Sequence, residues 1–411
     1  MTFAGDGPRP RVIVIGAGVG GSVVASRLAK HCDVVVLERG ASSRVIHDPT
    51  LAMQRSGFEG SPYPQGTGPG GGSRVNGMVF AHAPDSYWNS LVHMGLEVFA
   101  DAHGEQISFI GEESPCDGLV DRALRLAHPE VRPTMLATRN GVRLTAWDRL
   151  VTHGVTLHTG VTVSHLNFNG ERVMGVVTSK GEELTADHVI LCAGAISSSV
   201  LAARSGVIGD EIRLLDHPAL FVPLIRDRRD SSDAIERDPI CTTYAGAVHD
   251  KDGVSIMSIN GGVKGSGGLL VALITPRSSG KVFVSRDSVL IDRGFFSDAR
   301  DLEALRTGVR RAHWLLSQPS FSQFTSPMSS MLNGEEWQEQ VGDGVWHACG
   351  TLPMGLQEDF PLDESGKLRG TTNAWCMDAS VFPVIPPAPP QASVLVAAGL
   401  LANRFLSLVT S

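Results

Sequence analysis

This sequence lacks four features, and each absence excludes or disfavours a class of protein. It has no basic run, and 35 Lys and Arg against 43 Asp and Glu give a formal net charge of −8, which disfavours a general nucleic-acid binder. Its six cysteines include no C-x-x-C pair, so we expect reduced, buried thiols in a cytoplasmic protein. It has no run of about 18 uninterrupted apolar residues and no G-x-S-x-G, which disfavours a membrane-spanning helix and a serine hydrolase.

The composition that remains is typical of a globular enzyme. Hydrophobic residues make up 42% and charged residues 19% of the 411 residues, and 46 are glycine, as suits an α/β protein with many tight turns. A chain of this length exceeds what one hydrophobic core usually organises. We therefore expect two domains, or one domain enlarged by insertions.

The stretch RVIVIGAGVGGSVVASRLAKHCDVVVLERG, residues 11–40, has the pattern of a βαβ unit. Apolar runs predict buried strands at Val12–Ile15 and Val34–Leu37 with a helix between them. The turn before the helix has the spacing Gly-x-Gly-x-x-Gly, formed by Gly16, Gly18 and Gly21. A turn of this kind between a strand and a helix predicts dinucleotide binding.

Each residue of this motif has a physical task. Gly16 permits the tight turn, Gly18 lets the backbone approach a pyrophosphate, and Gly21 allows the helix to pack closely on the strand. The helix N-terminus supplies N–H groups and positive potential for the phosphates. Glu38, at the end of the second strand, can accept hydrogen bonds from an adenosine ribose. These residues alone leave FAD and NAD both open.

The next part of the chain is less regular. Residues from Ala41 to Gly72 are rich in Gly, Pro and Ser and lack periodicity, which predicts a long functional loop. We expect a short helix near Tyr87 to Met94. The turns Asn169-Gly170 and Lys180-Gly181 predict a three-stranded meander that leads into a buried strand, Val189 to Cys192.

Strand-like runs between Ala219 and Arg286 predict an antiparallel sheet, the candidate substrate domain. The runs are separated by Asp, Gly, Pro and Ser clusters and read ALFVPLIR, CTTYAGAV, VSIMSI, LLVALIT and KVFVS. Apolar residues at helical spacing predict a helix packed on this sheet at residues 301–318. The same spacing predicts a further helix at residues 393–408.

Five stretches, in order along almost the whole chain, resemble the glucose-methanol-choline (GMC) oxidoreductase family, whose members use FAD. They are the opening βαβ unit, GTGPGGGSRVNGMVF (66–80), ILCAGAISSSVLAARSG (190–206), LLDHPAL (214–220) with the segment 280–305, and WHACGTLPMG with MDASVFP (377–383). The resemblance implies an α/β fold with a Rossmann-type FAD-binding domain and a substrate domain built on an antiparallel sheet. The expected division assigns residues 1–217 and 342–411 to the FAD-binding domain and 218–341 to the substrate domain.

The stretch GVWHACGTLPMG contains the candidate base. By resemblance, His347 matches the family's histidine that faces the flavin and takes the proton of the substrate hydroxyl. A positioned imidazole contributes roughly 10²–10⁴-fold to such a step. From the residues alone, two alternatives stay open. In the first, His347 is a core histidine whose hydrogen bonds are made within the protein. In the second, it is a metal ligand together with Cys349, although the sequence offers no further ligands at recognisable spacing.

The family's second polar partner is missing from its usual place. Where Asn or His usually stands, this chain has Pro389, which offers neither a side-chain acceptor nor an N–H group. Gln391 can orient a substrate oxygen but does not take a proton at neutral pH. We therefore expect His347 and Gln391 as catalytic residues in a single-histidine oxidation, with a lost or redirected activity as the alternative.

The resemblance also assigns cofactor contacts in the glycine-rich loop. Asn76 and Gly77 are expected beside the flavin ring. Backbone N–H groups are expected to reach phosphate or ring from three neighbouring residues, which are Gly71, Gly72 and Ser73. Some members attach FAD through a histidine just before the Asn, and here Val75 stands there. We therefore expect non-covalent FAD.

Two further positions match a cofactor-contacting stretch near the C-terminus. Asp378 and Ala379 match residues that contact the ribitol or pyrophosphate of FAD. The alternative for Asp378 is a cap of a helix or strand end. The isolated histidines elsewhere are expected to be surface or structural residues, namely His82, His93 and His217.

Three functions follow as hypotheses. The first is an FAD enzyme that oxidises a CH–OH group of a small molecule, with its electron acceptor unknown. Its segments C-G-T-x-P-M-G and PPAPPQAS resemble those of the bacterial mycofactocin-associated branch. This resemblance implies a dehydrogenase that uses an electron acceptor other than oxygen. The second is a lyase or natural-product tailoring enzyme with non-standard use of flavin, motivated by Pro389. The third is a cofactor-free binding module.

Overall fold

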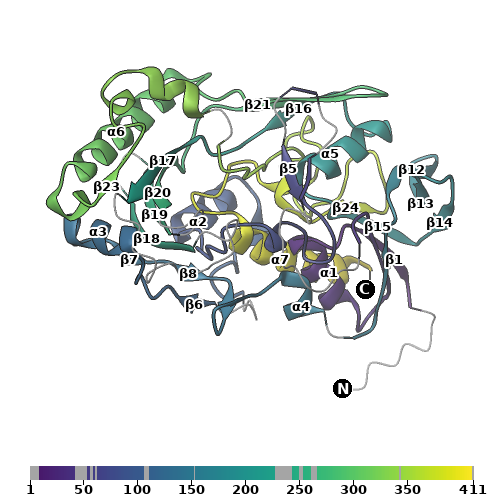
Figure 1. The fold of residues 1–411 in the computed structure, drawn as a ribbon. Helices are drawn as coiled ribbons and strands as arrows, with labels where there is room; N and C mark the ends of the chain where they lie inside the picture. Colours follow the sequence, from purple (N-terminus) through teal and green to yellow (C-terminus); the bar gives the residue numbers. More distant parts are fainter. Residues whose placement is uncertain are drawn as a thin grey trace.

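Two parts with separate sheets lie at opposite ends of the molecule (Figure 1). The structure is a computed structural model, and the residues it describes are 9–41, 53–55, 59–60, 63–105, 111–151, 153–226, 243–249, 253–260, 266–341 and 344–409. One part contains the parallel sheet and both ends of the described chain. The other part contains an antiparallel sheet flanked by helices. This arrangement agrees with the predicted fold class.

The first part is built on a five-stranded parallel sheet. Its strand order is β11 (Val155–Thr159), β2 (Asp33–Glu38), β1 (Arg11–Ile15), β15 (His188–Leu191) and β24 (Ala374–Cys376). β1 and β2 confirm the predicted strands and extend them by one residue at β1 and by one at each end of β2. These strands read as continuous apolar runs because parallel sheets are covered on both faces.

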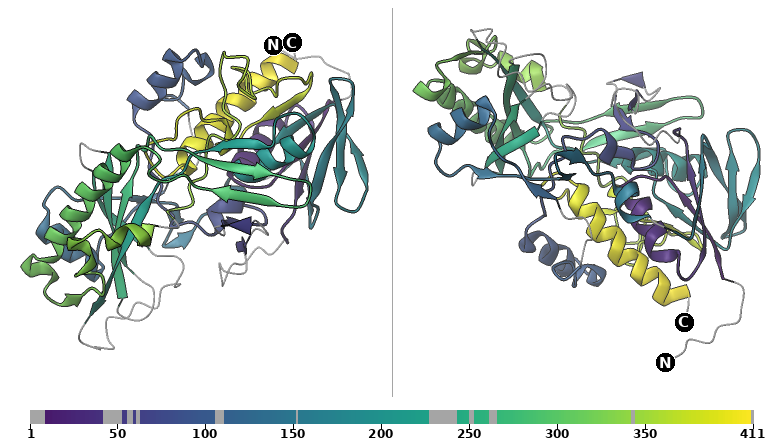
Figure 2. Two further views of the ribbon diagram at one scale, coloured as in Figure 1. Left: turned by 90° about the horizontal axis from the view of Figure 1, so that it is seen from above. Right: turned by 60° about the horizontal axis from the view of Figure 1, so that its bottom comes forward.

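Helices α1 (Val19–Leu28) and α7 (Gln391–Val409) lie side by side against this sheet (Figure 2). α7 is long and apolar enough to cross a membrane by length and composition alone. Most of its residues are buried inside the protein, including Leu395, Leu401 and Phe405. The apolar residues of α7 therefore pack in the hydrophobic core, and α7 corresponds to the helix predicted near the C-terminus.

The loops after the strands of the parallel sheet meet at one edge. Gly16, Cys192 and Met377 directly follow β1, β15 and β24, and backbone hydrogen bonds from Cys192 N to Ile15 O and from Met377 N to Leu191 O continue the pairing. The carboxyl ends of parallel strands form the usual ligand-binding edge of such sheets. Segments from three distant parts of the sequence are thereby brought together.

The second part is built on a six-stranded antiparallel sheet. Its order is β23 (Phe324–Thr325), β17 (Ala219–Arg226), β20 (Ser266–Leu273), β19 (Val254–Asn260), β18 (Thr243–His249) and β7 (Arg132–Pro133). α6 (Ala299–Leu316) packs on β19 and β20 as predicted. α3 (Leu119–Ala127) packs on β19, although no pattern predicted it.

Two predictions about this region need correction. The run KVFVS is β21 (Gly280–Val284), and it pairs with β16 (Glu211–Leu214) and β22 (Val289–Asp292) in a separate sheet that ends at β4 (Glu59–Gly60). The core of the antiparallel sheet also includes Val120, Leu124 and Val131, from a segment predicted to belong to the FAD-binding domain. Strand-like runs specify burial and alternation, but they do not specify a distant partner.

The meander is as predicted, with β12 (Val163–Asn169), β13 (Arg172–Thr178) and β14 (Glu183–Thr185) in one antiparallel sheet. Part of the predicted long loop, residues 42–52, 56–58 and 61–62, lies outside the described residues. The described remainder includes β3 (Met53–Arg55) paired with β5 (Pro64–Gly66), and the short 3-10 helix η2 (Gly71–Arg74).

The remaining helices are short. α2 (Asp85–His93) confirms the predicted helix near Tyr87, and α4 (Ala146–Leu150) packs on α1. α5 (Ala195–Arg204) follows β15, as its counterpart α1 follows β1. Three-residue to six-residue 3-10 helices are η3 (Glu97–Phe99), η4 (Pro319–Phe321), η5 (Met331–Asn333), η6 (Glu336–Val341) and η7 (Ala379–Val381). Two-residue strands are β6 (Glu112–Glu113), β8 (Met135–Leu136), β9 (Thr138–Arg139) and β10 (Val142–Arg143).

The cysteines that the structure describes are free and buried, as predicted. They are Cys32, Cys116, Cys192, Cys349 and Cys376. Cys241 lies outside the described residues.

Candidate active site

The candidate base lies in a segment held between two other stretches of the chain. Leu215 and Cys349 exchange backbone hydrogen bonds of 3.0 and 2.9 Å, which fixes the segment on one side. On the other side, Gly350 N donates to Ala379 O at 3.0 Å and Leu352 N to Ser380 O at 3.0 Å. The stretch 346–355, which contains His347, is thus hydrogen-bonded both to the residues that follow β16 and to the residues around η7.

His347 forms a pair with a second histidine. The Nδ1 atoms of His217 and His347 lie 2.9 Å apart, and the two rings are nearly perpendicular, with centroids 5.2 Å apart. His217 is 1% exposed, whereas His347 is only partly buried. His217 is therefore not a surface residue, and the contact with the candidate base is one that the sequence did not indicate.

A buried carboxylate fixes the backbone of both histidines. Oδ1 of Asp216 accepts from the backbone amide of His217 at 2.8 Å and from that of His347 at 2.7 Å. Oδ2 accepts from the hydroxyl of Tyr63 at 2.8 Å, and this hydroxyl in turn accepts from the amide of Ala348 at 2.7 Å. Burial raises the pKa of Asp216 to about 6, against the effect of these hydrogen bonds, which lower it.

Both imidazoles are neutral at pH 7. Burial lowers the pKa of His217 to about 4, and the carbonyls of Ile274 and Pro386 act weakly in the opposite direction. Burial, followed by the effect of His217, lowers the pKa of His347 well below the ordinary value. A neutral imidazole has one unprotonated nitrogen. His347 is therefore in the protonation state that a general base requires.

Gln391 is joined to the glycine-rich loop. Nδ2 of Asn76 donates a short hydrogen bond to Oε1 of Gln391, at the start of α7. Arg143 holds Asn76 in turn, since Nη1 donates to Asn76 Oδ1 at 2.9 Å and Nη2 to Asn76 O at 2.8 Å. Nε2 of Gln391 is buried and makes no hydrogen bond within the described part of the chain. Asn76 and Gln391, which were predicted separately as a flavin contact and a catalytic residue, are thus brought together, and Nε2 of Gln391 is left as a donor.

The phosphate turn has the geometry that its glycines predict. Gly16 has φ +102°, and an added Cβ would lie 2.4 Å from Cys192 O; at Gly21 an added Cβ would lie 2.0 Å from Gly16 O. Gly18 differs, because its Cβ would meet only Cys192 O at 3.9 Å and Gly71 Cα at 4.0 Å. The protein itself requires glycine at Gly16 and Gly21. At Gly18 it leaves space that it does not fill.

Glu38 has a structural role in this turn. Its Oε2 accepts from Ala17 N at 2.9 Å, and its Oε1 accepts from Gly40 N at 2.8 Å and Gly68 N at 3.0 Å. A carboxylate offers about four acceptor positions. One remains for the ribose contact, which stays a prediction.

The glycine-rich loop requires a correction. The amides of Gly71 and Ser73, expected to face phosphate or ring, instead donate to Gly68 O at 2.8 Å and Gly70 O at 3.1 Å. The Ser73 hydroxyl donates to Gly70 O at 2.7 Å. A tight 3-10 turn uses its own amides, and a spacing of glycines does not show this in advance. Gly72 keeps an open side, since an added Cβ there would meet no atom within 4 Å.

Asp378 is engaged by donors of the protein. Its Oδ2 accepts from Gly194 N at 2.8 Å and Ser198 Oγ at 2.6 Å, and its Oδ1 accepts from the amide and hydroxyl of Ser380 at 2.8 and 2.6 Å. Asp378 is the N-cap of η7, so the structure shows the capping alternative. Ala379, which follows it, uses its carbonyl to hold Gly350. A contact of either residue with FAD stays a prediction, as it does for Gly77.

A cavity of about 910 Å³ is lined by segments that adjoin these groups in the chain, although His217, His347, Asn76 and Gln391 are not among its lining residues. Its walls include Met257 of β19, Ile274 after β20, and the segment Pro387 to Pro389 that leads to Gln391. Ile274 connects the cavity to the histidine pair, because its carbonyl also acts on His217. Pro389, the departure from the family pattern, thus forms part of the cavity wall. His82 lines the cavity too, whereas His93 is exposed on α2.

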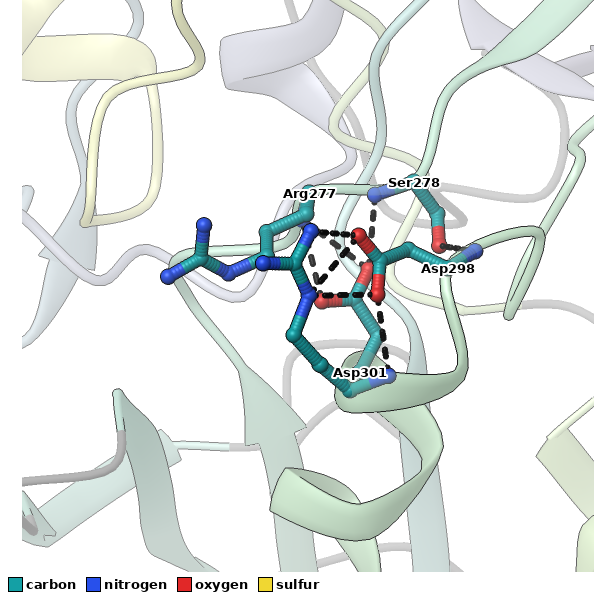
Figure 3. A network of polar contacts seen from close by, with 5 residues as sticks. Arg277, Ser278, Asp298 and Asp301 are labelled. Carbon is teal, nitrogen blue, oxygen red and sulfur yellow. Dashed lines mark hydrogen bonds and ion pairs between the residues drawn. The ribbon is translucent and has the colours of Figure 1, made fainter.

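The far wall of the cavity is fixed by a polar network at the start of α6 (Figure 3). The buried carboxylate of Asp301 accepts from the amides of Arg277, at 3.0 and 2.9 Å, and of Ser278, at 2.7 Å. Asp298 N donates to Ser278 Oγ at 3.0 Å. The side chain of Arg277 extends away from both aspartates (Figure 3). This network joins α6 to the segment after β20.

Sequence reasoning missed four contributors to the site. Asp216 and His217 carried a signal, since LLDHPAL was one of the stretches that resembled the family, but no pattern indicated contact with His347. Tyr63 and Arg143 carried no signal, because each acts through a contact made by the fold. Among the described residues, no three His, Cys, Asp or Glu side chains lie close enough together to hold a metal ion.

Comparisons with known proteins give a consistent result. Two family models described as GMC oxidoreductase match residues 131–219 and 276–398, together just over half of the chain. A 5-(hydroxymethyl)furfural oxidase of Methylovorus sp. (strain MP688) is 28% identical over 310 residues, which are 62% of this chain and 57% of that protein. An oxygen-dependent choline dehydrogenase of Chromohalobacter salexigens is 23% identical over 95% of this chain and 94% of its own length.

Solved structures show the same architecture. Pyridoxine 4-oxidase from Mesorbium loti superposes with a TM-score of 0.82 at 20% identity, covering 97% of this chain and 99% of that one. A formate oxidase variant of Aspergillus oryzae RIB40, described for its effect on FAD modification, gives 0.80 at 17% identity over 99% and 100% of the two chains. These matches confirm the predicted fold. The chain spans a little over half the length of the furfural oxidase and about a quarter of a dehydrogenase from Emericella nidulans.

Proposed function

Because the chain belongs to the glucose-methanol-choline oxidoreductase family, whose members bind FAD, we propose that it oxidises a CH–OH group of a small molecule with FAD as cofactor. The observation that carries the proposal is the neutral, partly exposed His347, which is paired with His217 and fixed by a buried carboxylate. No other described group in this site combines basicity with this anchoring.

The residues of the chain fit FAD at several points. Gly18 leaves space beside the turn. Gly72 and Gly194 have open sides, since an added Cβ at either residue would meet no atom within 4 Å. The N-terminus of α1 supplies positive potential next to that space. The buried Nε2 of Gln391 lacks a partner in the described chain, which suits a donor that faces a ligand oxygen or nitrogen. The glycine turn and Glu38 would hold the dinucleotide, with Asn76 and Gln391 near the ring.

When bound, FAD supplies the acceptor for the hydride of the carbinol carbon. The protein then has three tasks of its own. His347 takes the hydroxyl proton, which increases electron density at the carbinol oxygen as the hydride leaves. Gln391 orients the substrate oxygen through its free N–H group. The cavity walls exclude water and hold the rest of the substrate.

The proposal includes a single-histidine site. Pro389, in the cavity wall, has no side-chain group that could take a proton, so the proposed proton transfer uses His347 alone. Non-covalent FAD is part of the proposal too, because Val75 offers no nucleophile at the position before Asn76.

For the electron acceptor, we propose a non-oxygen acceptor in the bacterial cytoplasm. The support is the resemblance of C-G-T-x-P-M-G and PPAPPQAS to the mycofactocin-associated branch. A second candidate function, favoured by Pro389, is a lyase or tailoring reaction in which the flavin is not reduced by an alcohol.

The test is the visible absorbance of the purified protein, followed by anaerobic addition of primary and secondary alcohols. A flavin spectrum that one alcohol bleaches supports the oxidation, and recolouring by an artificial acceptor but not by air supports the dehydrogenase. A flavin that no alcohol bleaches would favour the second candidate. His347→Ala is expected to keep its flavin and to lose bleaching by roughly 10²–10⁴-fold.

A further inference from the structure

The histidine pair contains a group that the proposed reaction has not yet used. His217 is 1% exposed, and its Nδ1 lies 2.9 Å from Nδ1 of His347. The two rings are on separate segments that the Leu215 and Cys349 backbone hydrogen bonds join. A second histidine at this distance controls where the proton of the first one lies.

The contact between two Nδ1 atoms holds a single proton. If His217 donates it, Nδ1 of His347 is an acceptor and the proton of the neutral His347 ring is on Nε2. Neither nitrogen of His347 is then able to take a further proton without breaking that bond. If His347 donates it, the lone pair of His347 Nε2 is free. Only the second arrangement makes His347 a base.

The surroundings of His217 favour the second arrangement. Nδ1 of His217 is engaged by His347, and Nε2 is buried and makes no hydrogen bond within the described residues. The backbone carbonyls of Ile274 and Pro386 act on the ring and raise its pKa, and carbonyls accept hydrogen bonds but do not donate them. Because Nδ1 faces His347, we infer that these acceptors favour a proton on Nε2. A proton on Nε2 leaves Nδ1 of the neutral His217 as an acceptor.

We propose that His217 is a positioning residue that accepts the Nδ1 proton of His347 in a hydrogen bond and thereby keeps Nε2 of His347 free to take the substrate proton. This inference rests on the proposed function. In the step, the O–H bond of the alcohol breaks and its proton bonds to His347 Nε2, while the electron pair stays on oxygen and the hydride passes from carbon to FAD. His347 becomes an imidazolium, whose Nδ1–H donates to the neutral His217.

Asp216 makes this assignment testable. It anchors the backbone amides of both histidines, so the main chain stays anchored when only the side chain of His217 changes. In His217→Asn, the amide oxygen can occupy the place of Nδ1 and accept from His347. In His217→Leu, the volume is similar but no acceptor remains. The two variants separate the acceptor from the packing.

The first measurement is independent of turnover. ¹⁵N NMR of protein with labelled histidine distinguishes the two tautomers of a neutral ring, and the His347→Ala spectrum identifies the signals of His347. We expect the Nδ1–H tautomer at His347 in the wild type and in His217→Asn, and loss of this preference in His217→Leu. An Nε2–H tautomer at His347 in the wild type would overturn the proposal.

The second measurement is the anaerobic rate of flavin reduction by an alcohol that bleaches the wild type, from pH 5 to 10. We expect His217→Leu to reduce its flavin roughly 10–100-fold more slowly at saturating alcohol with KM little changed, and His217→Asn to recover most of the rate. Equal rates in His217→Leu and wild type would overturn the positioning role, as would equal losses in both variants. If His347→Ala also keeps the wild-type rate, the proposed function itself is wrong.

Discussion

Asp216 accepts the backbone amide of His347 at 2.7 Å, although 131 residues separate the two in the sequence. The same oxygen accepts the amide of His217, so one buried atom sets the spacing of the histidine pair. Because the two amides are main-chain groups, the spacing of the two backbones does not depend on the conformation of either histidine side chain. Asp216 thus positions the backbone of the candidate base, and the imidazole of His347 is the group expected to take the proton.

Replacement of this carboxylate should destabilise the protein. In Asp216→Asn, one oxygen acceptor becomes an NH₂ group, so at least one of the donors Tyr63 Oη, His217 N and His347 N loses its partner. A buried group without a partner costs about 1–3 kcal/mol. Urea unfolding should show this loss, whereas the exposed control Asp287→Asn should leave the midpoint unchanged. Equal midpoints for the two variants would contradict the role of Asp216.

Acidification should weaken the fold through the histidine pair. The pKa of His217 is lowered to about 4 in the folded protein, against about 6.5 in an unfolded chain. Between these values the unfolded state binds more protons, so stability falls as pH falls. Asp216 acts oppositely, since its pKa of about 6 lies above the unfolded value of about 3.9 and favours the folded state at low pH. Because the pKa of His347 is lowered as well, the two histidines outweigh the one aspartate.

The measurement is the free energy of unfolding at pH 7 and pH 5. We expect a loss at pH 5 that is smaller in His217→Asn, because asparagine does not titrate. If His217→Asn loses as much free energy of unfolding between pH 7 and pH 5 as the wild type, the pH dependence arises from other groups. His93→Asn, at an exposed position, is the matched control and should keep the wild-type loss.

Gly18→Ala should separate FAD binding from folding. An added Cβ meets nothing closer than 3.9 Å in the protein, so the variant should unfold like the wild type. The same Cβ occupies the space left for a pyrophosphate, and we expect FAD to bind roughly tenfold more weakly, which corresponds to about 1.4 kcal/mol. The flavin content per protein and a thermal melt measure the two effects. Gly209→Ala, in open space at the surface, should change neither, and Gly21→Ala should destabilise the fold.

Arg143 should matter for rate although it lies outside the histidine pair. It holds Asn76 by two hydrogen bonds, and Asn76 in turn holds Gln391. In Arg143→Met, we expect FAD to remain bound and flavin reduction by an alcohol to slow by roughly 10–100-fold, because small displacements of orienting groups are costly. Arg139→Met, on the neighbouring strand β9, is the control. Reduction at the wild-type rate in Arg143→Met would show that Gln391 needs no such support.

The sequence predicted those parts of the site that depend on local patterns. Gly16 and Gly21 follow a strand and open a helix. The positive φ of Gly16 and the close contact of Gly21 with Gly16 O both arise within the βαβ unit, whereas the close contact of Gly16 with Cys192 is made by the fold. The meander was predicted for the same reason, since its turns lie between neighbouring strands. The pairing of β21 with β16 was not predicted, because an alternating run shows which residues are buried but not against which strand.

The parts that escaped prediction depend on contacts between distant segments. His217 was an isolated histidine in the sequence, and the pairing of Leu215 with Cys349 together with the contacts of Asp216 brings it to His347. Asp378 was predicted to contact FAD or to cap a helix or strand end; its cap is local, through Ser380 N, but its contacts with Gly194 and Ser198, which are far away in the chain, had no signal in the sequence. For Gly71 and Ser73, the turn uses the amides that the motif alone assigned to a ligand.

The histidine pair also lies where the chain passes between the two parts of the protein. β16 ends at Leu214 and β17 begins at Ala219, so Asp216 and His217 form one crossing, and the stretch after η6 that contains His347 forms another. Both crossings are fastened to a single carboxylate. The carboxylate that aligns the histidine pair therefore also joins two segments of the chain at the junction of the two parts.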